Sequence, residues 1–87
     1  MEYEQYSKKG ETYIRINKIR ARNLYKKGVT IYLLADNIAF DSKFAINYPV
    51  SIEDNGDFNA AVESFAHDNC DIEHGLRVKY FVNQKHN

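Results

Sequence analysis

The chain of 87 residues has one cysteine, one proline, four glycines and no long apolar run. The single cysteine, Cys70, excludes an internal disulfide framework and agrees with a reducing compartment. No stretch approaches the roughly 20 apolar residues that a membrane span needs, and residues 1–10 lack the apolar centre of a secretory signal. A cytoplasmic protein is therefore expected.

The sequence also has few of the patterns that accompany catalysis. It contains no Gly-rich phosphate loop and no nucleophile elbow. Cys70 lies near His67 and His74, which pairs a thiol with a base. A thiol enzyme also needs a cleft, an orienting third group and an oxyanion site, which a domain of this size rarely supplies. We therefore predict no catalytic residue, no cofactor and no enzymatic activity.

Core-forming residues are abundant, since 44% of the chain is hydrophobic and 14% is aromatic. This composition predicts a packed domain rather than a disordered chain. The expected organisation is a flexible arm over residues 1–10, a single globular domain over residues 11–83 and a tail over residues 84–87. So short a chain buries only about 60 to 65% of its unfolded surface, so marginal stability or a stabilising partner is expected. The oligomeric state is left open.

Hydrophobic periodicity predicts six elements. Strands are expected over residues 11–17, 29–34, 44–52 and 76–82, and helices over residues 18–27 and from residue 58 onward. Asn17 and Asp57 are typical helix N-caps, Gly28 suits a left-handed C-cap, and Pro49 places the third strand at an edge. The second helix ends either near Asn69 or close to Gly75. This order predicts a two-layer α+β domain with both helices on one side of the sheet, as in the split βαβ or ferredoxin-like arrangement.

The first predicted helix has the most informative outer side. Ala21, Leu24 and Tyr25 share one side of the helical wheel and are expected to face the core. The opposite side is predicted to hold Ile19, Arg22, Asn23 and Lys26. An exposed isoleucine within a basic face predicts a protein-binding site. The alternative is that Tyr3 or Tyr6 of the arm covers Ile19.

The net charge of zero conceals an uneven distribution of charge. The sum is +5 over residues 1–35, −8 over residues 36–75 and +3 over residues 76–87. Two oppositely charged surfaces form if these segments stay apart, whereas interleaving neutralises them, which is the more common outcome in small domains. If the acidic segment forms a surface, Glu63 and Asp68 are its candidate partner-binding residues.

Two features bear on nucleic-acid binding. Lys18, Arg22 and Lys26 are spaced by four residues, which aligns them for phosphate contacts. Tyr13, Arg15 and Phe81 are expected on the open face of the sheet, where bases stack in RNA-binding sheets. Pairing of Tyr13 and Phe81 across strands is the preferred interpretation.

A possible metal-ligand set consists of Glu63, His67, Cys70 and His74, spaced by four, three and four residues. One straight helix would spread these side chains over about 16 Å at 1.5 Å per residue, which is too far for one ion. Only a turn near Cys70 would bring the last three together. We therefore predict a polar helix end and no metal site.

Several segments carry a resemblance to a known group of proteins. They are residues 13–16, 18–28, 31–34, 57–58, 65–70, 73–75 and 80–82. Over roughly residues 13–82 the chain resembles small uncharacterised accessory proteins of phages and prophages of low-GC Gram-positive bacteria. The resemblance implies binding to a host protein, and inhibitors of CRISPR nucleases are one class of such proteins. The absence of net negative charge argues against mimicry of DNA.

The function predicted from the sequence is therefore that of a non-enzymatic protein-binding module of phage or prophage origin, working in the cytoplasm of the bacterial host. An inhibitor of a host defence nuclease, such as a CRISPR effector, is the specific candidate. The alternative is a small nucleic-acid-binding accessory protein.

Overall fold

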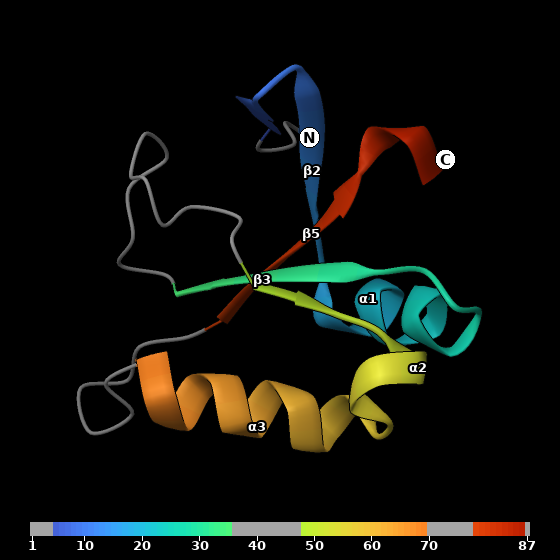
Figure 1. Cartoon of the computed structure of the whole chain (residues 1–87), viewed down its shortest axis with the longest axis vertical. Helices are drawn as coiled ribbons and strands as arrows, with labels where there is room; N and C mark the ends of the chain where they lie inside the picture. Colours follow the sequence, from blue (N-terminus) through green and yellow to red (C-terminus); the bar gives the residue numbers. More distant parts are fainter. Residues whose placement is uncertain (1–4, 36–47, 70–77, 87) are drawn as a thin grey trace.

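The computed structural model describes residues 5–35, 48–69 and 78–86, which form a twisted sheet with helices packed against it (Figure 1). The elements, in chain order, are β1 (Gln5–Lys8), β2 (Glu11–Ile16), α1 (Lys18–Lys26), β3 (Ile31–Ala35), β4 (Tyr48–Val50), α2 (Ile52–Asn55), α3 (Phe58–Asn69), β5 (Val78–Asn83) and the 3₁₀ turn η2 (Gln84–His86).

The sheet has five strands in the order β1-β2-β5-β3-β4, and each neighbouring pair is antiparallel. It follows that β2 and β3 run parallel with β5 between them, and that β4 and β5 run parallel with β3 between them. Each of the two helical connections, β2-α1-β3 and β4-α3-β5, therefore joins two parallel strands that have another strand between them. Such a connection is a split βαβ unit, and the ferredoxin-like arrangement also contains two of them. The predicted α+β class is confirmed, as is the edge position of β4, which contains Pro49.

The main hydrophobic core lies between the sheet and the helices. Helices α1 and α3 both contribute to it, so both cover the same face of the sheet. Its buried members are Ile16, Ala21, Tyr25, Ile31, Leu33, Val50, Phe58, Ala61, Val62, Phe65, Tyr80 and Val82. The two-layer packing predicted from the apolar faces of the helices is thereby confirmed.

A smaller cluster lies on the other face of the sheet. Successive strand residues point to opposite faces, so Phe81 points away from its neighbours Tyr80 and Val82. The ring of Phe81 is completely buried and meets the ring of Tyr6 edge-on at a centroid distance of 4.7 Å. Leu34 belongs to the same cluster. Strand β5 is thus apolar on both faces, as suits the middle strand of the sheet.

The flexible arm predicted over residues 1–10 is corrected for residues 5–10. Gln5–Lys8 form strand β1, which pairs with β2 through a turn at Lys9 and Gly10. Both turn residues have positive φ, 53° and 81°, the combination that a two-residue type I′ hairpin requires. The sequence of residues 5–8 is mostly polar because β1 is an edge strand in which only Tyr6 is fully buried.

The third predicted strand, residues 44–52, is also corrected. Strand β4 ends at Val50, and Ile52 begins the short helix α2 instead of continuing the alternation. Ser51 caps this helix, because its hydroxyl accepts a hydrogen bond from the backbone N–H of Asp54 at 3.2 Å. Residues 44–47 of the predicted strand lie outside the described residues.

The predicted helix boundaries agree with the structure where it describes them. Asp57 caps α3, since its Oδ1 accepts from the backbone N–H of Asn59 at 2.8 Å. Asn69 is the last helical residue given for α3. The continuation considered for residues 70–75 lies outside the described part of the chain.

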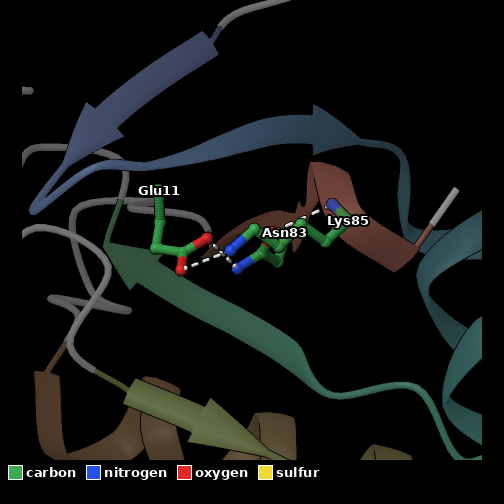
Figure 2. A network of polar contacts seen from close by, with 3 residues as sticks. All are labelled: Glu11, Asn83 and Lys85. Carbon is green, nitrogen blue, oxygen red and sulfur yellow. Dashed lines mark hydrogen bonds and ion pairs between the residues drawn. The ribbon is translucent and has the colours of Figure 1, made fainter.

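The tail predicted to begin at residue 84 is corrected as well, because residues 84–86 form the turn η2. A polar network fastens this turn to β2 (Figure 2). Lys85 Nζ lies 3.0 Å from Glu11 Oε1, and Asn83 Nδ2 donates to Glu11 Oε2 at 3.2 Å. These hydrogen bonds, led by that from Lys85, lower the pKa of Glu11.

The core position of Phe65 predicts a large effect of its truncation. Its ring is buried and lies 4.8 Å from the ring of Tyr48. Phe65→Ala should reduce the free energy of unfolding by about 3 to 5 kcal/mol, measured by denaturant titration. Ser64→Ala, a change at an exposed neighbour, should stay within about 0.5 kcal/mol of wild type. A loss below about 1 kcal/mol for Phe65→Ala would contradict the assigned inner face of α3.

The Glu11 network predicts a specific pH dependence of stability. A carboxylate with a lowered pKa stabilises the fold above its ordinary pKa, and this contribution disappears as pH falls through the folded-state value. The stability difference between wild type and Glu11→Gln should therefore shrink as pH falls below 4.5. Unfolding titrations across this range provide the measurement, and Lys85→Met should lose the larger part of this pH-dependent contribution, since the hydrogen bond from Asn83 remains. Parallel profiles for wild type and Glu11→Gln would refute the role of the network.

Candidate functional site

Helix α1 is held at both ends by local signals in the sequence. Asn17 Oδ1 accepts from the backbone N–H of Arg20 at 2.8 Å, which caps the start of the helix. At the other end, the N–H of Gly28 bonds to the carbonyl of Tyr25, and that of Val29 to the carbonyl of Leu24, each at 3.0 Å. This is a Schellman motif, and Gly28 supports it with a φ of 91°. The predicted caps are confirmed.

The buried side of α1 determines which side is presented outward. Ala21 and Tyr25 are buried against the sheet. The hydroxyl of Tyr25 donates to the backbone carbonyl of Ser51 at 2.9 Å, which joins α1 to the start of α2. Burial, and then the charges of Asp57 and Asp54, raise the pKa of Tyr25, so its hydroxyl keeps the proton that it donates.

The outer side of α1 is the candidate site. The name "α1 outer face" denotes Ile19, Arg22, Asn23 and Lys26, which are all exposed. Ile19 retains 66% of its accessible surface, the largest value among exposed large hydrophobic residues in the described part of the chain. The other three residues, at three, four and seven positions after it, follow it along the same side of the helix. The predicted exposure of all four residues is confirmed.

The alternative covering of Ile19 by Tyr6 is wrong. Tyr6 is buried against Phe81, in the cluster on the face of the sheet that α1 does not cover. Tyr3 lies outside the described residues. The covering of Ile19 by Tyr3 therefore stays a prediction, and within the described residues the side chain of Ile19 is exposed.

Charge is separated between the helices. Helix α1 and its C-cap carry five basic side chains and no acidic one, namely Lys18, Arg20, Arg22, Lys26 and Lys27. Residues 48–69 carry five exposed acidic side chains and no lysine or arginine, namely Glu53, Asp54, Asp57, Glu63 and Asp68. Within the described residues no ion pair joins α1 to α2 or α3. No ion pair between these helices therefore neutralises the charges within the described residues, and the neutralised surface expected from interleaving stays a prediction.

The alternative acidic surface lies on α3. Glu63 and Asp68 are both exposed, so both are accessible to a partner. The large hydrophobic side chains exposed in the described residues lie elsewhere, on α1, β4 and α2. The acidic surface therefore offers charge without an apolar anchor, whereas the α1 outer face offers both.

In the described residues, the aromatic rings on the open face of the sheet contact one another. Phe81 is fully buried, and Tyr13 meets Tyr32 edge-on with a centroid distance of 4.9 Å. The preferred interpretation, a pair formed by Tyr13 and Phe81 across strands, is wrong. The actual partners are Tyr32 for Tyr13 and Tyr6 for Phe81.

The metal-ligand set is only half described. Glu63 and His67 are exposed on α3, and Cys70 and His74 lie outside the described residues. Residues 5–35, 48–69 and 78–86 contain no group of three side chains able to hold a metal ion. The thiol and base considered for catalysis depend on the same undescribed positions, so these expectations stay predictions.

None of the helices in the described residues combines the length and the apolar character needed to cross a bilayer. The chain matches no protein-family model, no curated protein and no solved structure. The predicted phage or prophage origin therefore rests on the sequence resemblance alone.

The expectation about metal is testable directly. Protein purified without chelator should contain no stoichiometric zinc by elemental analysis, because Glu63 and His67 are exposed on one face of α3 with no third described ligand nearby. One zinc per chain that disappears in Cys70→Ser would show that a site forms. His67→Ala would then establish whether α3 contributes a ligand.

Proposed function

We propose that this chain is a non-enzymatic protein-binding module that contacts its partner through the α1 outer face. The observation that carries the proposal is the 66% exposure of Ile19 on a helix with basic and no acidic side chains. A large apolar side chain in water costs free energy that a partner recovers by burying it. The side chains of this face are one isoleucine, one arginine, one lysine and one asparagine, which suit non-covalent binding of a partner better than catalysis.

The charges of the α1 outer face indicate the chemistry of the partner surface. Arg22 and Lys26 lie one and two turns after Ile19 on the same side of α1, so the complementary surface is acidic beside an apolar depression. The resemblance to phage accessory proteins makes a bacterial host protein the partner class of this proposal. A defence nuclease, such as a CRISPR effector, is its specific form.

A second candidate function is nucleic-acid binding, favoured by one observation. Lys18, Arg22 and Lys26 are all exposed and repeat every four residues along α1. Such a row suits phosphates, and binding would weaken steeply with salt. Nucleic-acid binding ranks second for two reasons. Phosphates would form no contact that requires Ile19, and the aromatic rings of the sheet already pack against one another.

Binding kinetics test the proposal. A partner retained from a bacterial lysate by the immobilised chain is purified, and its rates are measured against variants. Ile19→Ala should raise the dissociation rate and cost about 1 to 2 kcal/mol, since a desolvated anchor controls residence time. Arg22→Ala combined with Lys26→Ala should mainly lower the association rate, and less so at high salt, because flanking charges guide encounter.

The matched control reverses charge on helix α3, with Glu63→Lys and Asp68→Lys. These changes should leave both rates near wild type. Unchanged rates for Ile19→Ala together with lost binding for the α3 variant would move the site to the acidic surface. Salt-sensitive binding of purified RNA or DNA, without a protein partner, would favour the second candidate.

A further inference from the structure

The turn between α2 and α3 contains an asparagine followed by a glycine. Asn55 is the last residue of α2, and Gly56 follows it with a φ of 72°. Both residues are exposed. Asparagine is one of the residues that degrade chemically in water, and glycine leaves its backbone nitrogen unhindered because it has no Cβ. The turn therefore places a solvent-accessible side-chain amide next to an unhindered backbone nitrogen.

The hydrogen bonds of α2 hold both of these groups. Asn55 Oδ1 accepts from the backbone N–H of Ser51 at 3.0 Å. The N–H of Gly56 donates to the backbone carbonyl of Ile52 at 3.2 Å. While these two bonds persist, the side-chain amide and the Gly56 nitrogen are each bonded to a partner at the start of the turn. The closed turn therefore opposes a reaction between them.

Helix α2 has little to keep it closed. It has four residues, and none of them is buried. Its start depends on the Ser51 hydroxyl, which accepts from the N–H of Asp54 at 3.2 Å. A single helical turn gains little from its backbone hydrogen bonds, and exposed segments open at a far lower cost than the whole domain unfolds. Brief openings of α2 accordingly release Asn55 while the sheet and its core stay folded.

We propose that Asn55 is a site of spontaneous deamidation and that the opening of α2 controls its rate. In the open turn, the backbone nitrogen of Gly56 gives its proton to hydroxide and attacks Cγ of Asn55. The new N–C bond closes a succinimide ring, and the side-chain nitrogen takes up a proton and leaves as ammonia. Water then opens the ring at either carbonyl, which leaves an aspartate or an isoaspartate. One water is consumed and one ammonia is released, so no other reactant is needed.

Both products change the segment that connects α1 to α3. Each adds a negative charge beside Glu53 and Asp54, which are exposed. Isoaspartate also adds one carbon to the main chain, which disturbs the hydrogen-bond spacing of α2. The start of α2 is the point at which Tyr25 of α1 is bonded, through the Ser51 carbonyl. This inference goes beyond the proposed function, because it concerns how long the chain stays chemically intact, with or without a partner.

Ageing of the intact wild-type chain at mildly alkaline pH, followed by peptide mapping, tests the proposal. Asn55 should gain about one dalton and yield isoaspartate, faster at higher pH because the attacking nitrogen is deprotonated. Asn59 is the internal reference, since it is exposed but lies within α3 and precedes Ala60, and it should keep its amide. Asn55→Gln should abolish the change, because its longer side chain cannot close the same ring. An intact Asn55, or equal reaction at Asn59, would overturn the proposal.

Two cap variants test the control by α2. Ser51→Ala removes the capping hydroxyl but keeps the backbone N–H that Asn55 accepts from. It should speed the reaction on the order of fivefold, because loss of an N-cap raises the open population of a helix by about that factor. Asn17→Ala, the matched loss of the N-cap of α1, should leave the rate at Asn55 unchanged. An unchanged rate for Ser51→Ala, or equal acceleration by both variants, would refute control by α2.

Discussion

The buried side chain of Tyr25 is the contact on which the helical layer depends. It belongs to α1, its hydroxyl bonds to the residue that caps α2, and its ring lies against the first residue of α3. A buried tyrosine hydroxyl needs a partner, and a backbone carbonyl 26 positions later in the chain provides it. Tyr25 lies on the buried side of α1 and holds this helix against α2. Because Ile19 lies on the opposite side of the same helix, the core contacts of Tyr25 determine that Ile19 points outward.

Much of this arrangement could be predicted from the sequence, because local rules determined it. Helix α1 begins at a capping asparagine and ends at a glycine, and the inner face of α3 repeats every three or four residues. The hairpin of β1 could not be predicted in this way, since Lys9 and Gly10 are a weaker turn signal than Asn-Gly, and the burial of Tyr6 depends on Phe81, far along the chain. Helix α2 was missed although Ser51 and Asp54 have the spacing of a capping box.

The candidate site shows the same division between local and distant causes. The exposure of Ile19 follows from the helical wheel and could be predicted. The attachment of α1 to the start of α2 could not, because a tertiary hydrogen bond between Tyr25 and Ser51 creates it. The distribution of charge over the surface could not be predicted either, since sequence sums do not reveal which helices share a layer. Here the basic residues of α1 and the acidic residues of α2 and α3 lie on neighbouring helices without pairing within the described residues.

The strand order has a consequence for how the chain acquires its fold during synthesis. Strand β5 lies between β2 and β3, yet it is synthesised after both. Before Val78 emerges, the β1–β2 and β3–β4 pairs have no shared neighbour, and isolated two-stranded units are marginal in water. Completion of the sheet therefore follows translation of this region, and its long sequence separations slow the search. In that interval the inner edges of β2 and β3 are open to strands of other nascent chains.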